Sequence, residues 1–160
     1  MWLKTLLVGG AVALSLLGLA VLVWRGDLLV SPDEKVDSAA LQTVRQIGAV
    51  QAEDSIESDY DVRWAEGFEI INTFVVDVGE AKTGAAIGKA ASRLRGHGWV
   101  LYSQDPTAVM MKSAKWSAVL DIIPFDPEAL RYHPKIRATL QARMKSMGSP
   151  VIISVSVDRS

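Results

Sequence analysis

The residues best suited to chemistry lie in the segment Gly79 to Gly84, where two glycines have the separation found in phosphate-binding loops. Such a loop needs Lys and then Ser or Thr directly after its second glycine, so that these side chains reach phosphate and magnesium. Ala85 and Ala86 occupy those two positions, and the carboxylate of Glu80 would repel an anion. The segment therefore predicts a tight turn followed by a closely packed helix, and not a nucleotide site.

Metal chemistry lacks the residues that it requires. The chain contains no cysteine, which excludes disulfides, thiolate nucleophiles and zinc–thiolate sites. Asp59 and Asp61 have the alternate spacing of a calcium-binding loop, but Arg63 and Trp64 stand where further oxygen ligands and a glycine are needed. We therefore expect no metal site and no cofactor.

The two histidines, His97 and His133, lack the spacing of a metal pair. His97 lies between two glycines at a predicted turn, and His133 precedes a proline at a predicted helix boundary. Either histidine could approach Asp77 or Asp121 in space, but the pattern favours an exposed turn or cap for each. The sequence predicts no catalytic residue, and it favours a protein that is not an enzyme.

Charge is divided unevenly along the chain. Residues 27–80 hold thirteen acidic and three basic residues, whereas residues 81–160 hold five acidic and twelve basic residues. Most of these basic residues fall on two predicted helices. If both helices cover one face of a sheet, the basic side chains share an outer surface that suits an anionic surface, an acidic partner or the acidic segment of this same chain. The residues of this predicted basic surface are Lys82, Lys89, Arg93, Arg95, Arg131, Lys135, Arg137, Arg143 and Lys145.

The other interpretation of these basic residues is an ordinary solvated helix face. Nucleic acid is not an expected partner, because no basic motif with interleaved aromatic residues is present.

An uncharged apolar run from Leu6 to Trp24 has the length of a membrane-spanning helix. At ~1.5 Å per residue the run forms a helix of roughly 28 Å, which matches the hydrocarbon core of a bilayer. A cleaved signal peptide is the alternative, with Gly18-Leu19-Ala20 as the cleavage site, but the apolar run continues past this point. We expect an uncleaved anchor at residues 1–25 in the plasma membrane, with the amino terminus inside. Small residues at helical spacing, such as Gly9 and Ala13, would allow a homodimer.

The segment after the anchor predicts a stalk and a linker. Ser31 and Pro32 have the pattern of a helix start, and a narrow apolar stripe continues to about Ala52, as in a juxtamembrane stalk helix. Residues 53–61 hold five acidic residues and no basic residue, which is typical of a solvated linker. The predicted divisions are thus residues 1–25, 26–63 and 64–160.

The pattern within residues 64–160 predicts strands and helices in the order β-α-β-β-β-α-β. Apolar residues on both sides of the strand from Phe68 to Val78 indicate a central, doubly covered position. We expect an α+β fold, a mostly antiparallel sheet with helices on one face, as a ferredoxin-like variant.

These features favour a single-pass membrane protein whose extracytoplasmic domain acts as a protein-interaction or scaffold module. Its expected partners are the membrane and an envelope protein or anionic surface. The alternative is a small-ligand-binding or enzymatic domain with a site between the helices and the sheet. A flat basic or apolar patch would favour the first function, and a deep pocket holding a buried ionised group would favour the second.

Overall fold

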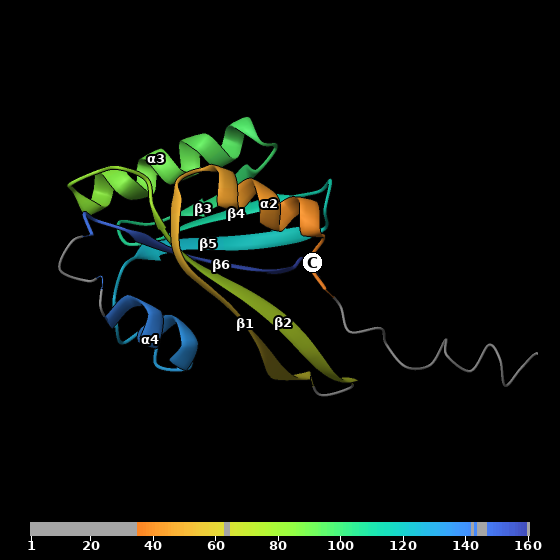
Figure 1. Ribbon diagram of the computed structural model, residues 1–160. Coiled ribbons are helices and arrows are strands. Elements are labelled where there is room, and N and C mark those ends of the chain that lie inside the picture. The colour runs from red at the N-terminus through yellow and green to blue at the C-terminus, as the bar shows by residue number, and fades with distance from the viewer. Residues whose placement is uncertain (1–34, 63–64, 142, 144–146, 160) are drawn as a thin grey trace, which may run out of the picture. The chain divides into compact units, whose positions relative to one another are not determined.

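The computed structural model describes residues 35–159 apart from 63–64, 142 and 144–146, and within them six strands form one antiparallel sheet (Figure 1). The strands lie in the order β1-β2-β6-β5-β4-β3. The strands are β1 (Ala49–Val62), β2 (Ala65–Asp77), β3 (Val100–Gln104), β4 (Val109–Ser113), β5 (Ala118–Pro124) and β6 (Val151–Val157), and the helices are α2 (Ser38–Gln46), α3 (Thr83–Gly96) and α4 (Pro134–Gln141). The expected α+β fold with an antiparallel sheet is confirmed.

The predicted anchor at residues 1–25 and its alternative cleavage site lie outside the described residues. In the part of the chain that is described, no helix combines the length and the apolar character needed to cross a membrane.

The last strand of the chain, β6, lies in the middle of the sheet between β2 and β5. Ile153 of β6 is opposite Phe74 of β2 and Ile122 of β5. Three successive apolar residues, Val151, Ile152 and Ile153, are all buried. Such a run is what a strand covered on both faces requires, because alternate side chains point to opposite sides.

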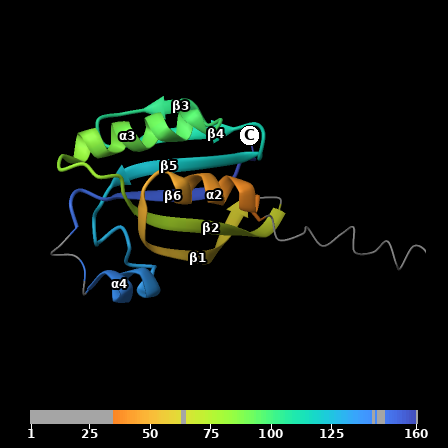
Figure 2. The same cartoon turned by 45° about the horizontal axis from the view of Figure 1, so that its top comes forward.

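Helices α2 and α3 cover one face of the sheet (Figure 2). The buried residues of α3 are small or slender, with Ala86, Ala90 and Ala91 beside Ile87 and Leu94. Small side chains let a helix approach a sheet closely, and they pack here with Phe74 and Ile153 in the larger apolar core.

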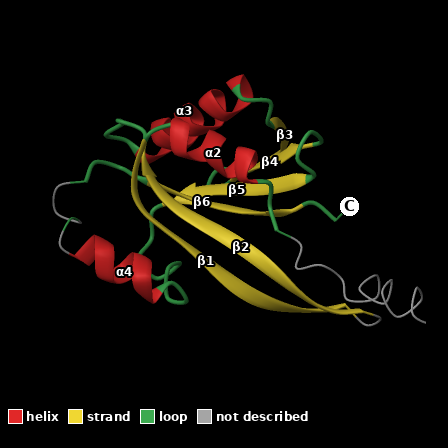
Figure 3. Cartoon of the chain, turned by 45° about the vertical axis from the view of Figure 1, so that its right-hand side comes forward, coloured by secondary structure: helices red, strands yellow, loops and turns green. Residues whose placement is uncertain are grey.

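Helix α4 covers the opposite face of the sheet (Figure 3), so the prediction that the helices lie on one face is wrong. Ile136 and Leu140 of α4 pack with Val75 of β2 and Ile152 of β6 in a second, smaller core. Val75 and Ile152 are next in sequence to residues of the larger core. The prediction failed because the central strands β2 and β6 carry apolar side chains on both faces, so each face of the sheet must be covered.

The predicted stalk helix is part of the folded domain. Helix α2 begins at Ser38, and the Asp37 side chain caps it by accepting a hydrogen bond from the Ala39 amide at 2.7 Å. Its apolar stripe, which includes Ala40 and Val44, is buried in the larger core because it packs against β2. The domain therefore begins well before the predicted boundary at residue 64.

The predicted acidic linker over residues 53–61 is instead most of strand β1. It pairs with β2 along nearly its whole length, from Ala49 opposite Asp77 to Val62 opposite Ala65. β1 is an edge strand, so side chains such as Glu57 stay in solvent while the backbone completes its hydrogen bonds. Because β6 pairs only with Asn72 to Val76 of β2, the first part of β2 and its partner in β1 extend beyond the sheet as a two-stranded arm.

Candidate functional site

The predicted basic surface is divided between the two faces of the sheet. Lys82, Lys89, Arg93 and Arg95 belong to α3 or its amino-terminal cap, on one face. The remaining described members, Arg131, Lys135, Arg137 and Arg143, lie on or beside α4, which packs on the other face. Lys145 lies outside the described residues. The structure therefore does not bring the two groups together on a shared helical surface.

Two basic side chains of α3 make contacts within the domain. The Lys89 ammonium pairs with the Glu80 carboxylate at 2.8 Å, and the Arg93 guanidinium donates to the carbonyl of Ile47. The contact of Arg93 joins α3 to the end of α2. These contacts give both residues a role in holding α3 in place.

The segment Gly79 to Gly84 forms the expected turn before α3. Gly79 has a φ of 74°, a left-handed conformation that favours glycine, and its amide donates to Asp77 at 2.8 Å. The Asp77 carboxylate thus serves this turn and approaches neither histidine in the contacts of the described residues. Glu80 and Lys89 pair beside the turn. The prediction of a tight turn is confirmed.

A chain of polar side chains joins α4 to the sheet. His133 lies directly before α4, and its Nε2 atom is 3.2 Å from Oγ1 of Thr73 on β2. Its Nδ1 atom faces the carboxylate of Asp54 on β1 at 3.8 Å and has no hydrogen-bond partner among the described residues. The Asp54 carboxylate also lies 3.4 Å from the ammonium of Lys135. The Thr73 hydroxyl in turn lies 3.5 Å from the hydroxyl of Ser154 on β6. We call Asp54, His133 and Thr73 the α4 clasp.

The pKa of His133 is lowered from its ordinary value of 6.5, chiefly because burial removes water from the imidazole. The negative charge of Asp54 opposes this effect, but it is the smaller influence. The prediction that His133 is exposed is wrong, because only 6% of the residue is accessible to solvent. The prediction for His97 is confirmed, since that residue is exposed at the carboxyl-terminal cap of α3.

The α4 clasp has the residue order of a hydrolytic triad, with carboxylate, imidazole and hydroxyl in line. A nucleophile must be reached by its substrate, whereas Thr73 is 2% exposed and lies beneath α4. The Asp54–His133 separation of 3.8 Å also exceeds a hydrogen bond. The arrangement therefore suits a structural contact that holds α4 on the sheet.

Asp121, the other acid considered as a histidine partner, lies on β5 and is half-buried. Burial raises the pKa of its carboxyl group. Among the described residues no three histidine or acidic side chains come together to hold a metal ion.

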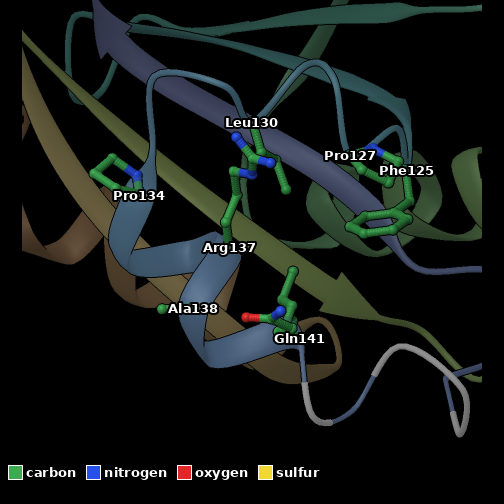
Figure 4. Close-up of a pocket in the computed structure, with 8 residues that line it drawn as sticks. Phe125, Pro127, Leu130, Pro134, Arg137, Ala138 and Gln141 are labelled. Atoms are coloured by element: carbon green, nitrogen blue, oxygen red, sulfur yellow. The ribbon is translucent and has the colours of Figure 1, made fainter.

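A groove lies between α4 and the segment that precedes it (Figure 4). Its volume is about 510 Å³, and most of its wall is apolar. The close-up shows Phe125, Pro127 and Leu130 on the preceding segment and the Arg137 side chain extending from α4 toward Leu130. The lining residues are Phe125, Pro127, Leu130, Pro134, Arg137, Ala138, Leu140 and Gln141.

The two edges of the sheet differ in character. β1 is acidic, and its side chains include Glu53, Asp54 and Glu57. β3 contains no charged residue, and it exposes Val100 at 66% and Tyr102 at 63%. Native edge strands are usually protected by short length, charge, proline, a β-bulge or cover. β3 is five residues long, and its register with β4 shifts between Leu101 and Ser103. Within the described residues β3 pairs only with β4, so its outer edge is open.

Comparisons with known proteins give no assignment: no family model, curated protein or solved structure matches this chain.

Proposed function

We propose that this chain is a single-pass membrane protein whose domain acts outside the cytoplasm as a protein-interaction or scaffold module. The apolar run at residues 6–24 supports the anchor, because it is free of charge and long enough for a bilayer. The open, uncharged edge of β3 supports the interaction role and is the observation on which the proposal depends most.

The proposed partner is an envelope protein that adds an extended segment to β3. Main-chain hydrogen bonds would supply affinity, and alternate side chains would supply specificity. Val100 offers apolar contact next to the open backbone, and Tyr102 adds an exposed aromatic ring that has the Lys112 ammonium 4.3 Å from its centre. The opposite edge is less suitable for an extended apolar segment, because exposed carboxylates of β1 such as that of Glu57 require water.

A photoreactive phenylalanine analogue at Tyr102 tests this role in intact cells. We expect irradiation to join the chain to an envelope protein, and the joined peptide of that protein to be a short apolar segment. Val100→Glu should abolish the product. The new carboxylate would lie opposite Lys112 of β4, so the sheet itself should be retained.

Tyr132→Glu is the matched control, because Tyr132 is 67% exposed against 66% for Val100 but lies outside β3. Equal loss of the cross-linked product in both variants would contradict a site at β3. So would a product that survives Val100→Glu unchanged.

Protease accessibility of a carboxyl-terminal tag in intact cells tests the proposed topology. Cleavage from outside, with Met1 or Trp2 at the amino terminus, is the result that we expect. A chain starting at Val21 would mean that the anchor is cleaved after Ala20. Protection of the tag would place the domain on the cytoplasmic side.

A second candidate function is small-ligand binding, which the groove beside α4 favours. Its volume of about 510 Å³ and its apolar wall with few polar groups are typical of sites for small molecules.

A further inference from the structure

We propose that the groove beside α4 binds a long-chain carboxylate, with the apolar chain along the groove and the carboxylate at Arg137. This inference rests on small-ligand binding, the second candidate function, and it is independent of strand pairing at β3. The groove and Arg137 are shown in Figure 4.

The wall of the groove suits an apolar chain. Phe125 and Pro127 contribute one side, Ala138 contributes to the α4 side, and Leu130 and Leu140 are buried residues that also line it. Covering such a surface removes apolar area from water at about 25 cal/mol per Å². The volume of about 510 Å³ falls within the range of roughly 300–1,000 Å³ that small-molecule sites occupy.

Arg137 is the cation that selects the head group. It lines the groove and forms no ion pair with any carboxylate among the described residues. A guanidinium binds a carboxylate through two parallel hydrogen bonds. Gln141, one helical turn further along α4, offers an amide donor on the same wall.

The neighbouring charged side chains have other contacts. Lys135 faces Asp54, and the Arg131 guanidinium lies 4.7 Å from the centre of the Tyr132 ring. Asp126, beside the groove, accepts a hydrogen bond from the Glu128 amide at 2.9 Å. One cation in the groove wall matches a ligand with a single negative charge.

The groove is held in place by the smaller core next to it. Ile136 packs in that core, Leu140 belongs both to the core and to the groove wall, and His133 contacts Thr73 before the helix begins. The wall that carries Arg137 and Ala138 is therefore fixed before a ligand arrives. A site formed in advance avoids the free-energy cost of ordering a loop on binding.

Photolabelling tests the proposal with the full chain in phosphatidylcholine nanodiscs. The probe is a twelve-carbon carboxylate with a diazirine near the end of its chain, and labelled peptides are identified by mass spectrometry. We expect labelling within residues 125–141. Free dodecanoate should compete with the probe, whereas dodecanol and dodecyltrimethylammonium should compete at least roughly tenfold less well, as expected for loss of a charge-assisted hydrogen bond.

Two variants distinguish the contribution of the carboxylate to binding from that of the apolar chain. Arg137→Gln should lower the apparent affinity roughly tenfold. Ala138→Trp should remove labelling by filling the groove, and Ala138 is exposed, so the fold should be retained. Arg95→Gln on α3 is the matched control, because it removes an exposed arginine on the opposite face of the sheet.

The outcomes that overturn the inference are distinct. If labelling is absent from residues 125–141, the groove is not a ligand site, and the second candidate function fails with the inference. If labelling occurs there but dodecanol competes equally, or Arg137→Gln has no effect, small-ligand binding stands and the carboxylate is wrong.

Discussion

Removal of the His133 imidazole should change how the stability of the domain depends on pH. His133 is buried beneath α4, and its pKa in the folded chain is lowered because burial disfavours the charged ring. Asp54 of β1 and Thr73 of β2 face it, and the ammonium of Lys135 on α4 contacts the Asp54 carboxylate. As the pH falls toward and below 6.5, the unfolded chain therefore binds a proton at this residue more readily than the folded chain.

The sign and size of the effect follow from this difference in proton binding. The free energy of unfolding falls as the pH decreases, by up to about 1.4 kcal/mol per pH unit while the unfolded chain holds one extra proton. For a domain of this size, each 1 kcal/mol lost from the free energy of unfolding lowers the Tm by roughly 4 °C. His133→Gln should remove this contribution, since the amide of glutamine does not titrate and can still contact Thr73.

Urea unfolding of the wild-type chain and of His133→Gln between pH 5 and pH 8 measures the difference. Tryptophan fluorescence follows the core directly, because Trp99 is 1% exposed. His97→Gln, which removes the exposed histidine, is the matched control. The reasoning would be refuted if the wild-type and His133→Gln curves stayed parallel below pH 6.5. It would also be refuted if the wild-type chain gained stability relative to His133→Gln on acidification, because the attraction of Asp54 would then exceed the effect of burial.

Three further predictions concern stability and are each tested by urea or thermal unfolding of the intact chain. Gly48→Ala should destabilise the domain by about 1–3 kcal/mol, because a Cβ atom there would lie 2.4 Å from the Asp77 carbonyl oxygen. Gly88→Ala on α3 should stabilise the domain by about 0.5–1 kcal/mol, because its Cβ atom would meet open space. A change of the same sign in both variants would contradict this reasoning. Asp121→Asn should stabilise the chain at pH 7, because burial raises the pKa of the carboxyl group and makes its charged form costly. This effect should be lost as the pH falls through the raised pKa of the folded chain toward the ordinary value of 3.8, and an effect independent of pH would contradict it. Thr43→Val should cost about 1–3 kcal/mol, because it removes the acceptor of the buried indole N–H of Trp99 at 2.9 Å, and an unchanged Tm would show that this hydrogen bond contributes little.

The sequence patterns predicted most strands and helices correctly where one physical cause was dominant. The alternating apolar residues of β2 end at Gly79, and the glycine takes the left-handed conformation that the turn requires. Helix α3 also follows this turn directly, as the sequence predicted. In these segments the period of the apolar residues and the position of glycine indicate the same boundary between strand and helix. One sequence is therefore enough to predict where the strand ends and the helix begins.

Strand β1 could not be recognised in the same way, because its composition is that of a solvated segment. An edge strand can keep most side chains in water, so its apolar signal is reduced to residues such as Ala52. Asp54 points to the side that α4 covers, but it is stabilised there by Lys135 and His133. These residues are about eighty positions away in the chain, and no local pattern relates them.

The position of α4 illustrates a constraint that the sequence contained and that the predicted fold did not use. Phe74 and Val75 are adjacent and both buried, so β2 needs cover on both faces. Helices on one face alone would leave Val75 and Ile152 in water. The groove could not be predicted at all, because its walls come from two segments whose angle is set by packing on the sheet.

Several of the basic side chains contact other parts of the domain, whereas the open features of its described surface are apolar. The sequence pointed to basic side chains as the recognition surface, yet Lys89, Arg93 and Lys135 contact other parts of the fold. Ion pairs at a protein surface contribute little free energy each, but they still occupy the charges that a partner would otherwise contact. The open apolar features, the edge of β3 and the groove beside α4, lie on different segments, so variants at Val100 and at Arg137 can be examined independently. If both variants left every partner and ligand unaffected, the basic residues of α3 and of α4, which lie on opposite faces of the sheet, would be the next surfaces to change.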